Sequence, residues 1–306
     1  MQEKVNATII YFSPCNSTRA RALEIERQLQ KTATVAVVDI TKTTDHPVSF
    51  VGEMLVVVLP IYNNSLPLPA KEWLQNSELD FRFALICLTY GGVSRGRAMD
   101  ECAQILNGKN IALASGGFLP TNHCYINKGG DDCNAKDIAV IKTLVDKALL
   151  NGALIVKTLI ANTLIDKTFA DTNLVDKTFI KNTIVNKTLV ENTPSVNNIL
   201  NINSKTTPTF AIKNSNSAPS KRLDKYRDAL FPKPYTDKKY CISCNKCIEA
   251  CPVGVINLSF LTSEKCIHCN ACVNVCETNA RIFKISKTAK FGIKFARLFN
   301  KKYIVL

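Results

Sequence analysis

The alternation of apolar and polar positions divides the first 150 residues into short buried strands separated by amphipathic helices. Strands that alternate with helices form a parallel sheet covered on both faces, so the pattern predicts an α/β doubly wound domain over residues 1–150. Five apolar runs predict five strands, at residues 6–12, 34–40, 54–59, 83–89 and 111–114. Helical periodicity predicts helices at residues 19–30, around Trp73 and Leu74, at 96–106 and at 135–150.

The next segment, residues 151–220, has a different pattern. Residues 157–193 repeat with a period of ten, and each copy begins with Lys-Thr. The Thr, Ile and Val content favours a stack of short strands, and continuation of the preceding helix is the alternative. Residues 194–219 are rich in Asn, Ser, Thr and Pro, which predicts a disordered linker. We interpret the whole segment as an insertion that separates two modules and carries no chemistry.

A polar loop at residues 13–18 joins the first predicted strand to its helix. Ligands of such folds bind beyond the carboxyl ends of the strands, which is where this loop lies. Hydroxyls of Ser13, Ser17 and Thr18, together with the N–H groups that open the helix, predict a site for one phosphate. A capped helix start without a ligand is the alternative, because Ser and Thr are common at that position.

Two further loops follow the third and fourth predicted strands, at residues 60–67 and 89–94. Tyr62 and Tyr90 offer aromatic faces, and Gly91 and Gly92 allow close approach of the backbone. These residues predict the binding face for a planar ring, and ordinary surface packing of each tyrosine is the alternative.

Eight of the thirteen cysteines form two copies of one spacing, C-x2-C-x2-C-x3-C. This spacing is the ligand run of a [4Fe–4S] cluster, in which three thiolates bind one cluster and the fourth reaches the other. The first cluster is predicted to take Cys241, Cys244, Cys247 and Cys276, and the second Cys266, Cys269, Cys272 and Cys251. A zinc site would need two cysteine pairs with a longer spacer. A disulfide scaffold would need an oxidising compartment, and the opening residues lack a signal peptide.

The cysteine-rich segment, about residues 236–285, resembles the bacterial-type dicluster ferredoxins. Cys251-Pro-Val-Gly-Val-Ile matches the ending of that family's motif, whereas the second copy has Glu277 and Asn279 in place of proline and glycine. Asn tolerates the left-handed conformation that glycine would supply, so we expect the turn to survive. The resemblance implies a small α+β ferredoxin domain over residues 221–285, followed by a tail at 286–306. His268, inside the second motif, is expected at the surface.

The first 150 residues resemble a flavodoxin-like domain fused ahead of such a ferredoxin, an arrangement of anaerobic microbes. Tyr11-Phe-Ser-Pro, Leu59-Pro-Ile-Tyr and Thr89-Tyr-Gly-Gly carry the match. The loop Ser13-Pro14-Cys15-Asn16-Ser17-Thr18 is similar to the flavodoxin phosphate loop, with Cys15 where threonine is usual and Asn16 where glycine is usual. The resemblance implies a flavodoxin-like fold that binds FMN through this loop and through Tyr62, Tyr90, Gly91 and Gly92.

The net charge of +14 is concentrated around the cysteine motifs. Residues 1–150 carry fifteen basic and fifteen acidic side chains, whereas residues 221–306 carry seventeen and six, a net charge of +11. Such an excess favours a redox partner with an acidic docking surface. Nucleic acid is disfavoured as a partner because no groove-reading or base-stacking motif accompanies the charge. The tail is basic and amphipathic, which predicts packing on the ferredoxin module, with peripheral contact to an anionic membrane as the alternative.

Together these features predict a cytoplasmic electron-transfer protein with two [4Fe–4S] clusters and FMN. Electrons are expected to pass between the flavin and the clusters and on to a separate redox partner. The sequence favours a carrier over a stand-alone enzyme. One alternative is an FMN-dependent oxidoreductase that reduces a small oxidant. The other is a ferredoxin whose flavodoxin-like domain no longer binds flavin and serves as a scaffold.

Overall fold

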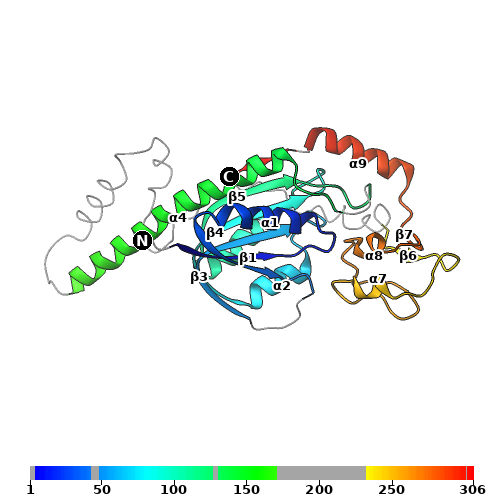
Figure 1. Ribbon diagram of the computed structural model, residues 1–306, viewed down its shortest axis with the longest axis horizontal. Helices are drawn as coiled ribbons and strands as arrows, with labels where there is room; N and C mark the ends of the chain where they lie inside the picture. Colours follow the sequence, from blue (N-terminus) through cyan, green and yellow to red (C-terminus); the bar gives the residue numbers. More distant parts are fainter. Residues whose placement is uncertain (1–3, 43–47, 127–129, 171–231, 301) are drawn as a thin grey trace.

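The N-terminal domain is built on a sheet of five parallel strands (Figure 1). The structure is a computed structural model that describes residues 4–42, 48–126, 130–170, 232–300 and 302–306. The strand order is β2-β1-β3-β4-β5, which is the flavodoxin-like doubly wound order. The predicted fold class is therefore confirmed. The strands are β1 Val5–Tyr11, β2 Ala33–Asp39, β3 Ser49–Pro60, β4 Glu78–Tyr90 and β5 Ala112–Pro120.

Helices cover both faces of this sheet, and each face has its own apolar core. Alternate residues of the central strands point to opposite faces, so Ile9 packs in one core and Ile10 in the other. Trp73 is the largest side chain of the core that contains Ile10. One face is covered by α1 Ser17–Leu29 and α4 Ala135–Ala170, and the other by α2 Leu68–Asn76 and α3 Ala98–Gly108.

Helix α4 is twenty residues longer than the sequence pattern predicts. It passes residue 150 and includes residues 157–170, where the ten-residue repeats begin. The prediction of short strands is therefore wrong for these residues, and continuation of the helix, the alternative, is right. No Pro or Gly interrupts the chain between Gly152 and Ala170, so the helix meets no breaker. Residues 171–193 of the repeats and the linker at 194–219 lie outside the described residues.

The C-terminal residues return to the N-terminal sheet as a sixth strand. Strand β8, Ile304–Val305, pairs antiparallel with β5, which would otherwise be an open edge. The N–H of Leu306 donates to the carbonyl of Gly116 at 2.7 Å. Helix α9, Lys287–Asn300, leads into this strand and connects it to the cysteine-rich module (Figure 1). The sequence pattern predicted neither the strand nor the return.

The cysteine-rich module is small and has little regular structure. It contains the two-stranded antiparallel sheet β6 Tyr235–Thr236 and β7 Arg281–Ile282, with the short helices α7 Lys246–Glu249 and α8 Ala271–Asn274. Only a few apolar side chains of this module are buried, among them Ile256 and Ala271. So small a core supplies little folding free energy, and bound metal can supply the rest. In Figure 1 the module lies beside the end of the N-terminal sheet.

Deletion of residues 303–306 should loosen the edge of the N-terminal sheet. The deletion removes the β8 pairing, and with it the bond from Tyr303 Oη to Asp137 Oδ1 at 2.6 Å. Amide hydrogen exchange followed by mass spectrometry should then be faster in peptides of β5 and of α9. Peptides of β1 at the sheet centre serve as the control and should not change. Unchanged exchange in β5 would show that the strand pairing contributes nothing to the edge.

Candidate functional site: two cysteine cavities and a polar loop

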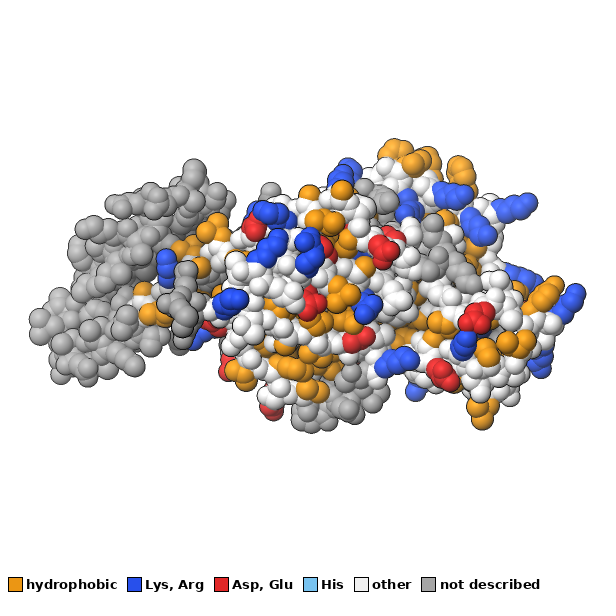
Figure 2. Space-filling model, in the orientation of Figure 1, with side chains coloured by type: hydrophobic (Ala, Val, Ile, Leu, Met, Phe, Trp, Pro, Cys, Tyr) orange, Lys and Arg blue, Asp and Glu red, His pale blue; other side chains and the backbone are white. Residues whose placement is uncertain are grey.

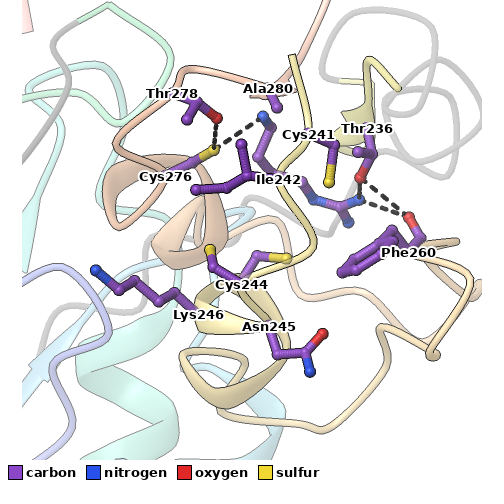
Figure 3. A pocket seen from close by; sticks show the side chains of 12 residues that line it. Thr236, Cys241, Ile242, Cys244, Asn245, Lys246, Phe260, Cys276, Thr278 and Ala280 are labelled. Carbon is purple, nitrogen blue, oxygen red and sulfur yellow. Dashed lines mark hydrogen bonds between the residues drawn. The ribbon is translucent and has the colours of Figure 1, made fainter. Parts of the chain in front are cut away.

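The first three cysteines of one motif share a cavity with the last cysteine of the other. This cavity has a volume of about 320 Å³, which includes space open to solvent, and Arg281 is one of the residues that line it. Figure 3 shows sulfur atoms that point toward a common space. Cys244 is exposed to solvent, so this cavity lies at the surface of the module. Its four cysteines are Cys241, Cys244, Cys247 and Cys276, the set predicted for the first cluster.

A second cavity, of about 290 Å³, collects the remaining four cysteines of the motifs. Cys269 and Cys272 are buried, in contrast to the exposed Cys244 of the first cavity. The set is Cys251, Cys266, Cys269 and Cys272, the one predicted for the second cluster. In the described part of the chain, no three His, Cys, Asp or Glu side chains converge in the way that the ligands of a single ion do. Instead, four cysteine thiols line each of the two cavities.

Backbone conformations repeat between the two motifs with the same offset of 25 residues as the cysteines. Non-glycine residues with positive φ occur at Asn245 (60°) and Asn270 (61°). Gly254 (60°) and Asn279 (54°) form a second such pair, so Asn279 takes the conformation expected of it. Left-handed residues in a tight loop turn successive N–H groups toward the same point, where they stabilise negative charge. Ser243 (55°) and His268 (57°) form a third pair.

Hydrogen bonds to sulfur stabilise the thiolate form of Cys276. The N–H of Arg281 donates to Cys276 Sγ at 3.3 Å, and the hydroxyl of Thr278 lies 3.7 Å from it (Figure 3). Burial alone would raise the pKa of Cys276, but these contacts outweigh it and the pKa falls below its ordinary value. Cys251 Sγ likewise accepts the N–H of Val255 at 3.4 Å. Such bonds are among the contacts that set cluster potentials in proteins.

The polar loop at residues 13–18 turns through a left-handed residue directly before α1. Asn16 has a φ of 67°, so it takes the conformation that glycine would have, and α1 begins directly after it. Ser13 Oγ accepts the N–H of Arg19 at 2.9 Å, and Ser17 Oγ accepts the N–H of Asp131 at 3.1 Å. A hydroxyl that accepts a bond keeps its own hydrogen, so both side chains are held in place with a donor to spare.

The remaining side chains of this loop differ in how far they fit a phosphate. The hydroxyl of Thr18 forms a hydrogen bond with that of Thr89 at 2.8 Å. One of the two hydroxyl hydrogens is used in this bond, so the pair has one hydrogen left to donate to a ligand. Pro14 and Asn16 contribute backbone only. The thiol of Cys15 donates to the carbonyl of Cys269 at 3.0 Å, so it serves a different contact. The loop therefore fits a phosphate through its hydroxyls and backbone, without Cys15.

The two tyrosines predicted to face a flavin ring lie in different surroundings. Tyr62 lies close to the thiols of Cys15, Cys269 and Cys124; burial first, and then the charge of these thiols, hold its pKa well above the usual range. Tyr90 is buried in the core, and its hydroxyl accepts the N–H of Lys302 at 2.9 Å. Tyr90 thus anchors the C-terminal tail, and its ring is not an open face.

The two glycines after Tyr90 lie against the neighbouring loop. Gly92 has a φ of 77°, a conformation that side chains disfavour. A Cβ atom at Gly91 would lie 2.6 Å from the ring of His123. Gly91 therefore allows the ring of His123 to pack against the backbone. The ring of His123 lies where the sequence analysis expected a flavin ring.

Comparison with known proteins agrees with the two cysteine cavities. Residues 234–257 and 261–282 match the model of the 4Fe-4S binding domain. The C-terminal module is a 4Fe–4S binding domain. Its cysteines indicate [4Fe–4S] clusters, and such a domain beside a flavodoxin-like fold indicates electron transfer. No curated protein matches the chain in sequence.

Solved structures similar to this chain align with its N-terminal half. A flavodoxin from the domain Archaea shares 16% identity with a TM-score of 0.32, and covers 48% of this chain and 98% of its own. Flavodoxin 1 from Bacillus cereus shares 13% identity with a TM-score of 0.37, and covers 47% and 97%. An NAD(P)H:quinone oxidoreductase from Methanothermobacter marburgensis shares 12% identity with a TM-score of 0.34, and covers 47% and 98%.

The 4Fe–4S domain contacts the N-terminal domain through the loop of its second motif. His268 is buried, and its Nδ1 lies 3.1 Å from the hydroxyl of Tyr125. The amide of Asn270 donates to the carbonyl of Cys124 at 3.4 Å. The expectation that His268 lies at the surface is wrong, because the N-terminal domain covers it. No local pattern in the sequence indicates this contact, since its two sides lie more than a hundred residues apart.

Arg281 is a buried cation within the 4Fe–4S domain. Its guanidinium donates to Thr236 Oγ1 at 2.7 Å and to the carbonyl of Phe260 at 2.8 Å, and it also bonds Thr262. Burial raises the pKa of Cys272 to about 11, against the opposing effect of a hydrogen bond from Arg281. Burial also raises the pKa of Cys247, and the charge of Arg281 opposes this rise without cancelling it. Arg281 therefore acts on thiols of both cavities.

Cys276 is the last cysteine of the second motif, but it lines the cavity of the first three cysteines of the first motif. We therefore predict that Cys276→Ala destroys the first cluster and leaves the second intact. The wild-type protein, reconstituted without oxygen, should hold about eight iron and eight sulfide, and the variant about four of each. Iodoacetamide should then alkylate Cys241, Cys244 and Cys247 in the variant and spare Cys266 and Cys269. Cys251→Ala is the matched control and should give the opposite pattern. Alkylation of Cys266 and Cys269 in Cys276→Ala would contradict crossed ligation.

Removal of the Arg281 charge should lower the reduction potentials of both clusters. A nearby cation stabilises the more negative, reduced cluster, so Arg281→Gln makes reduction harder. The expected shift is roughly 60–120 mV if the cation favours the reduced form by one to two powers of ten. A redox titration followed by electron paramagnetic resonance measures it. Arg281→Lys keeps the charge and should shift the potentials less. Equal shifts in both variants would assign Arg281 a packing role only.

Proposed function

We propose that this chain is an electron carrier in which the second cluster exchanges electrons with FMN and the first cluster exchanges them with a partner protein. The contact between Cys15 of the polar loop and Cys269 of the second cluster set carries the proposal. It joins a loop with the shape of a phosphate site to a cysteine with the spacing of a cluster ligand. Electron transfer slows steeply with distance, so direct contact between the two sites favours exchange between them.

The residues that would hold FMN are those of the polar loop. Ser13, Ser17 and Thr18 offer hydroxyl donors to its phosphate, and the N–H groups at the start of α1 add a favourable dipole. The side chain of Asn16 makes no cap on this helix, and the hydroxyl of Ser13 accepts the N–H of Arg19 in its first turn. When bound, FMN would supply one- and two-electron redox chemistry. Tyr62 is the aromatic side chain next to the loop that would contact the ring.

The burial of the cysteines supports an order for the two clusters. Cys269 and Cys272 of the second set are buried beside the N-terminal domain, whereas Cys244 of the first set is exposed. The first cluster is thus the one that an external protein approaches. Lys239 and Lys246 lie in the segment around this set, and Lys246 is paired with Glu277 at 2.5 Å. The excess of basic residues there favours a partner with an acidic surface.

A second candidate function is that of a ferredoxin carried on a flavin-free scaffold. Two observations favour it: the thiol of Cys15 bonds to protein, and the ring of Tyr90 is buried where it anchors the tail. In this case the polar loop is a docking surface for the 4Fe–4S domain. The two candidates differ in one measurable property, which is the affinity of the protein for FMN.

Flavin binding tests the proposal directly. If the polar loop binds the phosphate, FMN should bind and riboflavin should bind much more weakly. Thr18→Ala removes a hydroxyl donor to a charged acceptor, worth about 1.5–3 kcal/mol, so FMN affinity should fall roughly ten- to a hundredfold. Titration with flavin fluorescence as the readout measures each affinity.

Thr89→Ala is the matched control for Thr18→Ala. It breaks the same hydroxyl pair but leaves the hydroxyl of Thr18 in the loop, so FMN affinity should change little. The route is tested with Cys244→Ala, which removes a ligand of the outer cluster. Flavin reduced in that variant should deliver electrons to an added acceptor protein more slowly than in the wild type. Equal affinity for FMN and riboflavin would favour the scaffold function instead.

A further inference from the structure

Helix α9 turns its apolar side toward solvent. The exposed fractions are 70% for Phe291, 53% for Phe295, 79% for Leu298 and 60% for Phe299. At 3.6 residues per turn, these four positions span about 100° of the helix circumference. The rings form a continuous row, with centroids 6.2 Å apart between Phe291 and Phe295 and 5.0 Å apart between Phe295 and Phe299. Large exposed apolar patches of this kind mark interaction sites.

Contacts on the opposite side hold the helix in this orientation. Ile293, which lies opposite the apolar row, is only 4% exposed. Arg297 Nη2 donates to the carbonyl of Thr121 at 3.4 Å. Just beyond the helix, the N–H of Lys302 donates to Tyr90 Oη at 2.9 Å. The helix therefore cannot roll to bury its apolar side against the protein without breaking these contacts.

Basic residues line one flank of the apolar row. Lys287, Lys290 and Lys294 fall within about 60° of one another on the helix circumference, next to the row. The helix contains no acidic residue. Figure 2 shows hydrophobic side chains at the top right, where Figure 1 places α9, with basic side chains beside them. Long lysine side chains beside an apolar row reach outward while the row is buried, as in helices that lie at a membrane surface.

We propose that α9 binds in the plane of an anionic lipid bilayer, with its apolar row among the acyl chains and its lysines at the phosphate headgroups. The helix has fourteen residues, and no helix in the described ranges is long and apolar enough to cross a bilayer. A second copy of the chain is a poorer occupant, because two such faces would bring their lysines together. An acidic protein would satisfy the lysines but leaves the aromatic row without a matching apolar surface.

Vesicle flotation of the full chain with its clusters tests the proposal. The protein should float with vesicles of phosphatidylcholine mixed with phosphatidylglycerol, and much less with phosphatidylcholine alone. The double variant F295S/L298S removes two side chains of the row and should lower the bound fraction roughly tenfold or more. L258S is the matched control, because Leu258 is 82% exposed and lies outside α9. Iron content and circular dichroism should be unchanged in both variants.

A second measurement reports insertion and the competing occupant. In F295W, vesicles with brominated acyl chains should quench the new tryptophan, whereas in L258W they should not. Sedimentation velocity without lipid gives the oligomeric state. A dimer that F295S/L298S dissociates would overturn the proposal and assign the row to a second copy. Absence of flotation, or equal flotation of wild type and F295S/L298S, would also overturn it.

Discussion

Each of the two cysteine motifs supplies one cysteine to the cavity of the other motif. The folding of the 4Fe–4S domain depends on this exchange. Each cavity takes three cysteines from one loop and its fourth from the other motif. Neither loop can then close a four-thiolate site without its partner, so the two halves must fold together. The module has few buried apolar side chains, so bound metal would supply much of its folding free energy. Arg281 adds a buried positive charge that acts on thiols of both cavities.

Two separate attachments hold the 4Fe–4S domain to the N-terminal domain. One is the loop of the second motif, where His268 and Cys269 contact Tyr125 and Cys15. The other is the tail, in which α9 leads to β8 on the edge of the sheet. A module joined by two distant contacts has less rotational freedom than one joined by a linker alone. This restriction keeps the same cysteine loop over the polar loop, which is the arrangement that the proposed route for electrons requires.

The C-terminal tail, residues 287–306, contains a strand that completes the sheet and a helix with an exposed apolar row. Its last strand completes the sheet and removes an open edge, and Tyr90 fixes the turn before that strand. Its helix is held by Ile293 on one side, which leaves the aromatic row on the other side in water. Leaving such a row exposed costs free energy. Interaction with a surface that covers the row would recover it.

The sequence alone determined the parts that depend on local spacing. The five parallel strands follow from short apolar runs, and the pairing of Cys276 with the first triplet follows from the cysteine spacing. The left-handed turns at Asn16 and Asn279 follow from the tolerance of asparagine for positive φ. These features depend on nearby residues, so a local pattern is enough to predict them. The extension of α4 to Ala170 was missed because the repeat carries two apolar pairs per ten residues, a pattern that favours neither helix nor strand.

Tertiary structure decided which side chains of the predicted flavin face are open. Tyr90 has the sequence position of a ring contact, but the returning tail takes its hydroxyl. Cys15 has the position of a phosphate donor, but its thiol bonds to Cys269, which lies 254 residues away. His268 is polar and lies in a loop, yet Tyr125 and its neighbours bury it. Each outcome depends on a contact between segments far apart in the chain, and no local pattern of apolar and polar residues encodes such a contact.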